Sequence, residues 1–270
     1  MRREQLYIST MADDAGQTAR KYGLGVEIAE YCTAWNMDRD LAMTKEVVAE
    51  EIDGVVRLTL HGPFNEVSPA AIDPLVLDVT KKRYGQAVAL ALEYGAKKVI
   101  IHTGCSPDWY FAEWYRECAI TFWQEFLLEH PGDYQIVFEN VLETDPEMIL
   151  DIVKAVSDPR FKLCVDIGHA NASIGYGKRM GINRIGEAAD KCPDVYSWAH
   201  DCAPYISHLH IHNNFGDFDT HNALWDGTID MKRLLMQVEN ECDENVTYTL
   251  EVHDSDANVN WLMKEGLLYD

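Results

Sequence analysis

Histidines recur at every second position in one apolar stretch of the sequence, at His208, His210 and His212. In an extended strand alternate side chains point to the same face, so we expect all three imidazoles on one side of the backbone. An Asp-x-His pair, Asp219 and His221, follows shortly afterwards. Imidazole nitrogens and carboxylate oxygens together are ligands of transition metals. The stretch is therefore a candidate metal site, although any single histidine here could equally be a core residue satisfied by backbone groups.

Eight short runs rich in β-branched and apolar residues predict the strands that position these side chains. They are residues 5–10, 25–31, 56–61, 98–102, 134–141, 162–167, 206–213 and 247–253. The segments between them have helical periodicity, and one of them, residues 84–94, precedes Gly95, which is typical of a helix end. This alternation predicts an α/β fold, a (β/α)8 TIM barrel. A doubly wound sheet is the alternative, but no Gly-x-Gly-x-x-Gly follows the first strand.

No linker divides the chain, so we expect residues 1–270 to form a single domain. The longest segment without a regular pattern, residues 170–189, is rich in glycine and follows the sixth predicted strand. We expect it to be a loop at the catalytic face of the barrel. Lys178 and Arg179, together with Arg184, place positive charge there. They are predicted to bind an anionic group of the substrate, and the alternative is an ordinary solvated loop.

Histidines or carboxylates end each of the last six predicted strands or follow them closely. They are His61, His102, Glu139, Asp166 with His169, His210 with Asp219 and His221, and Glu251. In a TIM barrel all strands end at one face, so these side chains are expected to meet. Individually, the first two could bond to backbone carbonyls, and the Asp-x-x-His pair could be an ion pair at a helix start. Together they favour a cluster of divalent metal ions, because a lone buried carboxylate would be costly.

The motifs that carry these residues are Leu-His61-Gly-Pro, His102-Thr-Gly, Phe-Glu139-Asn, Val-Asp166-Ile-Gly-His169, His210-Ile-His-Asn, Asp219-Thr-His221 and Leu-Glu251-Val. Across essentially the whole chain, the combination resembles the xylose isomerase-like TIM-barrel superfamily. That superfamily contains sugar and sugar-phosphate isomerases and epimerases together with endonuclease IV. Similarity to the epimerases implies one divalent metal, often manganese, bound by Glu139, Asp166, His210 and Glu251. The two glutamates would also be catalytic and move protons.

Similarity to endonuclease IV implies a larger site with three zinc ions. The first would be bound by His61, His102 and Glu139. Glu139 would bridge to the second, held also by Asp166, His210 and Glu251, and the third would be bound by His169, Asp219 and His221. All nine positions are occupied here, which favours a multinuclear site and hydrolysis of a phosphoester in a small phosphorylated or sugar-like substrate. Isomerisation or epimerisation of a sugar or sugar phosphate is the alternative.

The formal net charge of −22 bears on the substrate. Proteins that grip DNA normally present a basic surface to the phosphates, and even three bound zinc ions would leave this chain strongly acidic. We therefore expect a small-molecule substrate and no stable binding to nucleic acid, which disfavours an abasic-site endonuclease. Non-enzymatic metal binding is a further alternative.

Cysteine usage and hydropathy predict the compartment. The seven cysteines are scattered and include no Cys-x-x-Cys, which is typical of reduced thiols. The sequence contains neither a signal-peptide pattern nor an apolar run long enough to span a membrane. We expect a cytoplasmic enzyme without membrane attachment, and the pattern leaves its oligomeric state open.

Overall fold

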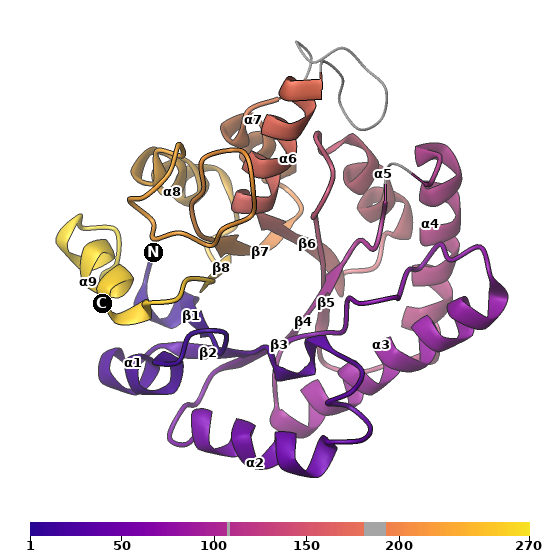
Figure 1. Ribbon diagram of the computed structural model, residues 1–270, viewed down its shortest axis with the longest axis horizontal. Helices are drawn as coiled ribbons and strands as arrows, with labels where there is room; N and C mark the ends of the chain where they lie inside the picture. The colour runs from indigo at the N-terminus through magenta and orange to yellow at the C-terminus, as the bar shows by residue number, and fades with distance from the viewer. Residues whose placement is uncertain (107–108, 181–192) are drawn as a thin grey trace.

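The computed structural model of the protein describes residues 1–106, 109–180 and 193–270. Within these residues, eight parallel strands pair in chain order, and β8 pairs with β1 to close the sheet into a barrel. Figure 1 shows the strands as a ring with the helices around its outside. The structure thus confirms the (β/α)8 barrel that the alternating sequence patterns predict.

All eight predicted strands are present, and most are shorter than their sequence patterns. The strands are β1 (Leu6–Ser9), β2 (Gly25–Ile28), β3 (Leu58–His61), β4 (Lys98–His102), β5 (Gln135–Glu139), β6 (Phe161–Asp166), β7 (Ile206–Ile211) and β8 (Thr247–Leu250). The α-helices are α1 (Ala15–Tyr22), α2 (Leu41–Glu51), α3 (Pro74–Tyr94), α4 (Ala112–Glu129), α5 (Glu147–Val156), α6 (Ile167–Met180), α7 (Val195–Cys202), α8 (Met231–Glu241) and α9 (Ser255–Lys264), with short 3-10 helices η1 (Arg3–Gln5) and η2 (Glu30–Cys32). No helix in the described part of the chain has the length and apolarity needed to cross a membrane.

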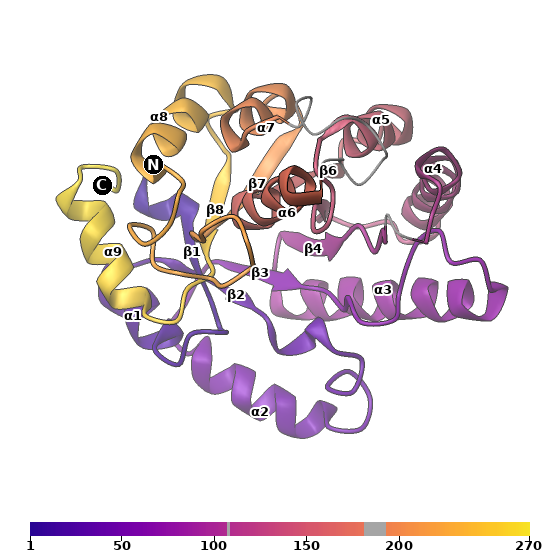
Figure 2. The ribbon, with the colours of Figure 1, turned by 45° about the horizontal axis from the view of Figure 1, so that its top comes forward.

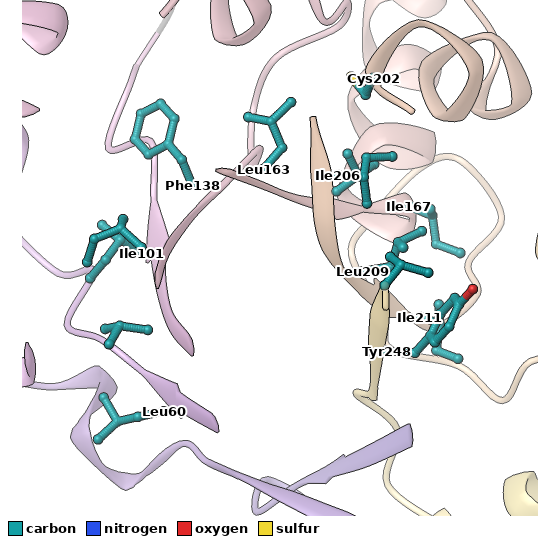
Figure 3. Close-up of a cluster of buried hydrophobic side chains, with 14 of the residues drawn as sticks. Leu60, Ile101, Phe138, Leu163, Ile167, Cys202, Ile206, Leu209, Ile211 and Tyr248 are labelled. Atoms are coloured by element: carbon teal, nitrogen blue, oxygen red, sulfur yellow. The ribbon is translucent and has the colours of Figure 1, made fainter. Parts of the chain in front are cut away.

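Side chains alternate along each strand between two environments. One set faces outward and packs under the helices to form the main core, as Leu60, Ile101, Phe138 and Leu163 do in Figure 3. The residues next to them in sequence point into the barrel. Three of these inward residues make a small apolar cluster of their own, namely Ile100, Val137 and Cys164. Most of the candidate metal ligands occupy the same alternate positions as these inward residues, so the strands direct their side chains toward the barrel axis.

Helix α6 corrects one prediction, because residues 170–180 are helical and not a loop. Glycine costs a helix roughly 1 kcal/mol relative to alanine, which is why the glycine-rich sequence favoured irregular structure. Tertiary packing explains the glycines. A Cβ on Gly168 would lie 1.9 Å from the ring of His212, and one on Gly175 would lie 1.8 Å from the carbonyl oxygen of Gly216. The rest of the predicted loop, including Arg184, lies outside the described residues.

Candidate metal centre

The carboxylate of Glu139, the last residue of β5, lies at the centre of the candidate site and is fully buried. Its Oε2 atom lies 3.5 Å from Nε2 of His61 and 3.4 Å from Nε2 of His102. Its Oε1 atom lies 3.4 Å from Nδ1 of His169 and 3.2 Å from Nδ1 of His210. Each carboxylate oxygen therefore faces two imidazoles.

Three carboxylates converge on one nitrogen of His210. Its Nδ1 atom lies 3.2 Å from Glu139, 3.7 Å from Asp166 and 3.3 Å from Glu251. The opposite ring nitrogen, Nε2, lies 3.2 Å from Oε1 of Glu27. The structure thus brings together the four residues that the epimerase resemblance assigns to a single metal ion.

A second group of donors lies toward solvent, around Asp219 in the loop between β7 and α8. One oxygen of Asp219 lies 3.1 Å from Nε2 of His169 and 3.0 Å from Nε2 of His221. His221 has a φ of 47°, a left-handed backbone conformation that is uncommon for a residue with a side chain. Such strain persists where the surrounding structure enforces it, often at functional sites.

Amide side chains fix the loop between β7 and α8 against α6. Asn213 donates hydrogen bonds to the carbonyls of Leu224 and Ile229, each at 3.0 Å. Asn214 donates to the carbonyl of Gly168 at 2.8 Å. Figures 1 and 2 both show this orange loop beside α6. Its two candidate ligands are therefore held near those of the barrel strands.

Three of the candidate histidines have their Nδ1 atom within hydrogen-bonding distance of a main-chain carbonyl. His61, His169 and His221 contact the carbonyls of Gly62 at 2.9 Å, Asn140 at 3.0 Å and Glu251 at 2.9 Å, respectively. A carbonyl only accepts, so Nδ1 carries a proton, and in the neutral ring the lone pair of Nε2 is available. Histidines that bind metals are commonly oriented in this way by an outer hydrogen bond.

The charges of the site fit a divalent metal. Glu139 and Asp166 are fully buried, and Glu251 is 7% exposed. Within the described residues, the ion-pair contacts of these three carboxylates are all with histidines and none with lysine or arginine. Oε2 of Glu139 is also buried without a hydrogen bond. Because uncompensated buried carboxylates are costly, the residues present suit the binding of a cation.

The imidazoles differ in how readily they would give up a proton. Burial lowers the pKa of His102 to about 4, so this ring is neutral at physiological pH. For His221, burial alone would lower the pKa, but the hydrogen bond with Asp219 and the charge of Glu251 outweigh it and raise the pKa to about 9. Burial would raise the pKa of Glu139, yet the charge on His210 and the hydrogen bonds from His169 and His210 hold it well below its usual range.

These shifts predict how metal uptake depends on pH. We expect the affinity of the metal-free protein for Zn²⁺ to increase as pH rises from about 6.5 to about 9, because the metal must displace the proton of His221. While Asp219 is ionised in the unfolded chain, above about pH 4, the His221–Asp219 pair should stabilise the metal-free protein fully up to about pH 6.5 and progressively less as pH rises through about 9. Competition titrations with a chromophoric chelator at several pH values measure the affinity. His221→Ala should flatten the upper part of this dependence, and an affinity that falls with pH would contradict it.

A cavity of about 450 Å³ opens over the cluster. Its wall includes six of the candidate ligands, namely His61, His102, His169, Asp219, His221 and Glu251. The ring of Phe64, also in the wall, stacks on His102 with a centroid separation of 4.6 Å. A second cavity of about 450 Å³ shares Val141, His169 and Asp219 with the first. The two adjoining cavities can accommodate a small molecule.

The predicted anion-binding residues Lys178 and Arg179 lie in the last turn of α6, and both are exposed. Arg179 lines the second cavity, and its guanidinium donates to the carbonyls of Gly216 at 2.7 Å and Asp217 at 3.1 Å. Lys178 is not among the described residues that line either cavity. The structure therefore brings only Arg179 to the site, where it contacts the loop that carries Asp219.

Sequence reasoning missed two buried residues that contact the predicted ligands. Nε2 of His212 lies 3.2 Å from each oxygen of Asp166, and Glu27 contacts His210 from below. His212 is one of the three histidines at alternate positions, and Glu27 stands between two aliphatic residues in a predicted strand. Both patterns could have indicated a polar side chain inside the barrel. His208 has an ordinary structural role instead, since its two nitrogens contact threonine hydroxyls at 2.6 and 2.9 Å.

Comparison with solved structures supports the fold. A D-tagatose 3-epimerase-like protein is 19% identical, with 97% of this chain and 96% of that chain aligned and a TM-score of 0.72. A Thermus thermophilus protein soaked with ZnCl2 is 20% identical, with 97% of each chain aligned and a TM-score of 0.69. The IolI protein with a bound zinc atom is 15% identical, with 97% of this chain and 96% of that chain aligned and a TM-score of 0.70.

Sequence comparison identifies the family. An uncharacterized protein of Methanocaldococcus jannaschii is 26% identical in an alignment 195 positions long that covers 68% of this chain and 60% of that protein. The chain thus spans less than two thirds of the length of this relative. The family model described as xylose isomerase-like TIM barrel matches residues 17–268. The motifs at the strand ends point to the same relationship, and the chain belongs to the xylose isomerase-like TIM-barrel family.

Proposed function

We propose that the protein is a divalent-metal-dependent isomerase or epimerase that acts on a small sugar or sugar phosphate. The observation that carries this proposal is the convergence of Glu139, Asp166 and Glu251 on Nδ1 of His210 beside a cavity of about 450 Å³. Proteins of similar fold include the D-tagatose 3-epimerase-like protein and a D-allulose 3-epimerase from Methylomonas sp., which supports this reaction over phosphoester hydrolysis. The preference drawn from the number of ligands alone is therefore replaced by its alternative.

In this reaction, a bound divalent ion would polarise the substrate carbonyl and acidify the neighbouring C–H bond. Burial alone would raise the pKa of Glu139 and of Glu251, but nearby histidines lower both, so each carboxylate is ionised and can accept a proton. We assign one glutamate to remove the proton from carbon and the other, after taking a proton from solvent water, to deliver that proton to carbon. Asp166 and His210 complete the metal site, and Phe64 forms part of the cavity wall.

Hydrolysis of a small phosphoester is the second candidate, and a specific observation favours it. Five further donors surround the four-residue site, with His61 and His102 beside Glu139, and with Asp219 between His169 and His221. These groups could bind additional ions, up to three zinc ions in all, which suits phosphoryl chemistry. Manganese in the four-residue site alone would suit the isomerase.

An isotope experiment separates the two reactions. The protein loaded with Mn²⁺ or Zn²⁺ is incubated in D₂O with a panel of ketoses, aldoses and their phosphates, and products are followed by NMR. We expect deuterium at the carbon beside the carbonyl, together with a new epimer or isomer. A parallel panel of phosphoesters is assayed for released phosphate. Phosphate release without deuterium incorporation would replace the isomerase proposal by hydrolysis.

Arg179 provides a test of substrate charge. Two of its guanidinium donors are used by loop carbonyls, and the side chain lines the second cavity, so its remaining donors can bind a phosphate. We expect Arg179→Ala to raise the KM for a phosphorylated sugar about tenfold more than for its unphosphorylated counterpart, in line with the loss of a charged hydrogen bond. Lys178→Ala is the matched control and should change neither value appreciably. Equal effects of Arg179→Ala on both substrates would show that the side chain only holds the loop.

A further inference from the structure

Glu27, in the middle of β2, is fully buried inside the barrel below the candidate metal centre. Its Oε2 atom accepts hydrogen bonds from the hydroxyls of Thr59 at 3.0 Å and Thr249 at 2.9 Å. The same oxygen lies 3.4 Å from Nε2 of His208. Its Oε1 atom accepts no hydrogen bond of good geometry and lies 3.2 Å from Nε2 of His210. One carboxylate oxygen is thus fixed by hydroxyls while the other faces a candidate metal ligand.

A continuous chain of polar contacts supports this carboxylate from the other end of the barrel. Nζ of Lys98 donates to the hydroxyl of Thr247 at 2.7 Å, and that hydroxyl lies 2.6 Å from Nδ1 of His208. Nε2 of His208 lies 2.9 Å from the hydroxyl of Thr249, which donates to Glu27. TIM-barrel interiors are mostly filled by branched apolar side chains, so a buried polar column requires a specific reason.

A separate metal site does not explain why this column of buried residues is polar. Cys164, His208 and His210 have ligand atoms within 4.8 Å of one another, but both nitrogens of His208 already contact hydroxyls. Glu27, His210 and Glu251 also have ligand atoms within 4.8 Å of one another, but the two carboxylates approach different nitrogens of the imidazole. Glu27 faces Nε2, whereas Glu139 and Glu251 face Nδ1. The contact of Glu27 with the centre therefore passes through the imidazole ring.

We propose that Glu27 is a positioning residue that sets the orientation and tautomer of His210. The charge of Glu27, 3.2 Å from Nε2, favours the tautomer with the proton on Nε2, which leaves the lone pair of Nδ1 directed at the metal centre. This inference rests on the proposed metal function of His210. Outer carboxylates of this kind orient a ligating histidine and raise its basicity, and their loss typically weakens metal binding about 10- to 100-fold. His210 would then be a ligand through Nδ1, whereas His61 and His221 present Nε2.

Cobalt binding tests the proposal without an activity assay. Glu27→Gln keeps the shape of the side chain and removes its charge, and we expect it to bind Co²⁺ about 10- to 100-fold more weakly than the wild type, with an altered visible absorption spectrum. Thr59→Val is the matched control, since it removes a hydroxyl that contacts only the other oxygen of Glu27, and its Co²⁺ spectrum should match that of the wild type. Wild-type affinity and spectrum in Glu27→Gln would overturn the positioning role. Failure of the wild type itself to bind Co²⁺ would instead remove the proposed metal centre.

A measurement on the wild type covers the case in which Glu27→Gln does not fold. Two-bond ¹H–¹⁵N correlation spectra of the Zn²⁺-loaded protein report which nitrogen of each histidine carries a proton. We expect His210, assigned with a His210→Asn variant, to be protonated on Nε2 and coordinated through Nδ1. A proton on Nδ1 of His210 would exclude the proposed role of Glu27.

Discussion

Glu139→Gln is expected to lower kcat/KM on the authentic substrate at least about 10²-fold, the lower end of what a positioned acid or base contributes. The two oxygens of Glu139 face four imidazoles, at distances of 3.2 to 3.5 Å. Glutamine retains the shape but removes the charge that compensates a metal ion and the base that accepts a proton. The isomerase and the hydrolase both depend on this group, so either reaction should be lost. Steady-state kinetics and circular dichroism measure activity and folding.

Two further variants are compared with Glu139→Gln, one as a control for burial and one to test the donor group around Asp219. Glu143→Gln is the matched control, because Glu143 is also buried but one of its oxygens accepts the backbone N–H groups of Val141 and Leu142 instead of facing the imidazoles. Its activity should exceed that of Glu139→Gln by a wide margin. His221→Ala removes a donor from the group around Asp219 and leaves all four side chains of the four-residue site in place. If His221→Ala is as inactive as Glu139→Gln, the full cluster is required and hydrolysis gains support, whereas near-normal activity shows that the four-residue site suffices. A Glu139→Gln variant that retains most activity would contradict the central assignment.

Removal of bound metal should abolish activity and lower the melting temperature by about 5 °C or more. A metal that binds only the folded state stabilises it by about 2.7 kcal/mol at a concentration 100-fold above its dissociation constant, and each kcal/mol is worth roughly 2–4 °C in a protein of this size. The physical origin is the group of buried carboxylates around His210, which repel one another when no cation lies between them. Calorimetry before and after dialysis against a chelator measures the change.

Re-addition of single metals then identifies the ion and its stoichiometry. Zn²⁺ and Mn²⁺ are added separately to the chelated protein, and bound metal is measured by mass spectrometry beside activity. More than one ion per chain would support occupation of the donor groups around His61 and Asp219 as well as the four-residue site. One ion per chain would favour the mononuclear isomerase. Full activity and an unchanged melting temperature after chelation would argue against any metal role.

Several features of the protein follow from local patterns in its sequence. The alternation of apolar and polar residues within each strand determines which side chains face the barrel axis, and the order of strands and helices determines the barrel. In a closed parallel barrel all strand ends lie at one face. The gathering of Glu139, His210 and Glu251 could therefore be predicted without coordinates. Helix α6 could not be predicted in this way. The helix penalty of its glycines is a property of the local sequence, whereas Gly168 and Gly175 pack against the loop after β7, which is distant in the sequence.

Tertiary structure alone decided how these residues pair. Periodicity specifies the face on which a side chain lies, but the depth at which it meets side chains of other strands depends on the stagger and closure of the barrel. Glu27 and His210 lie on β2 and β7, which are not neighbours in the sheet, and closure brings their side chains to 3.2 Å. Likewise, the carbonyls of Gly62, Asn140 and Glu251 select the tautomers of three histidines through main-chain positions that residue types do not encode. The sequence by itself determined which candidate ligands are present, and the tertiary structure determined which nitrogen of these histidines faces the candidate metal centre.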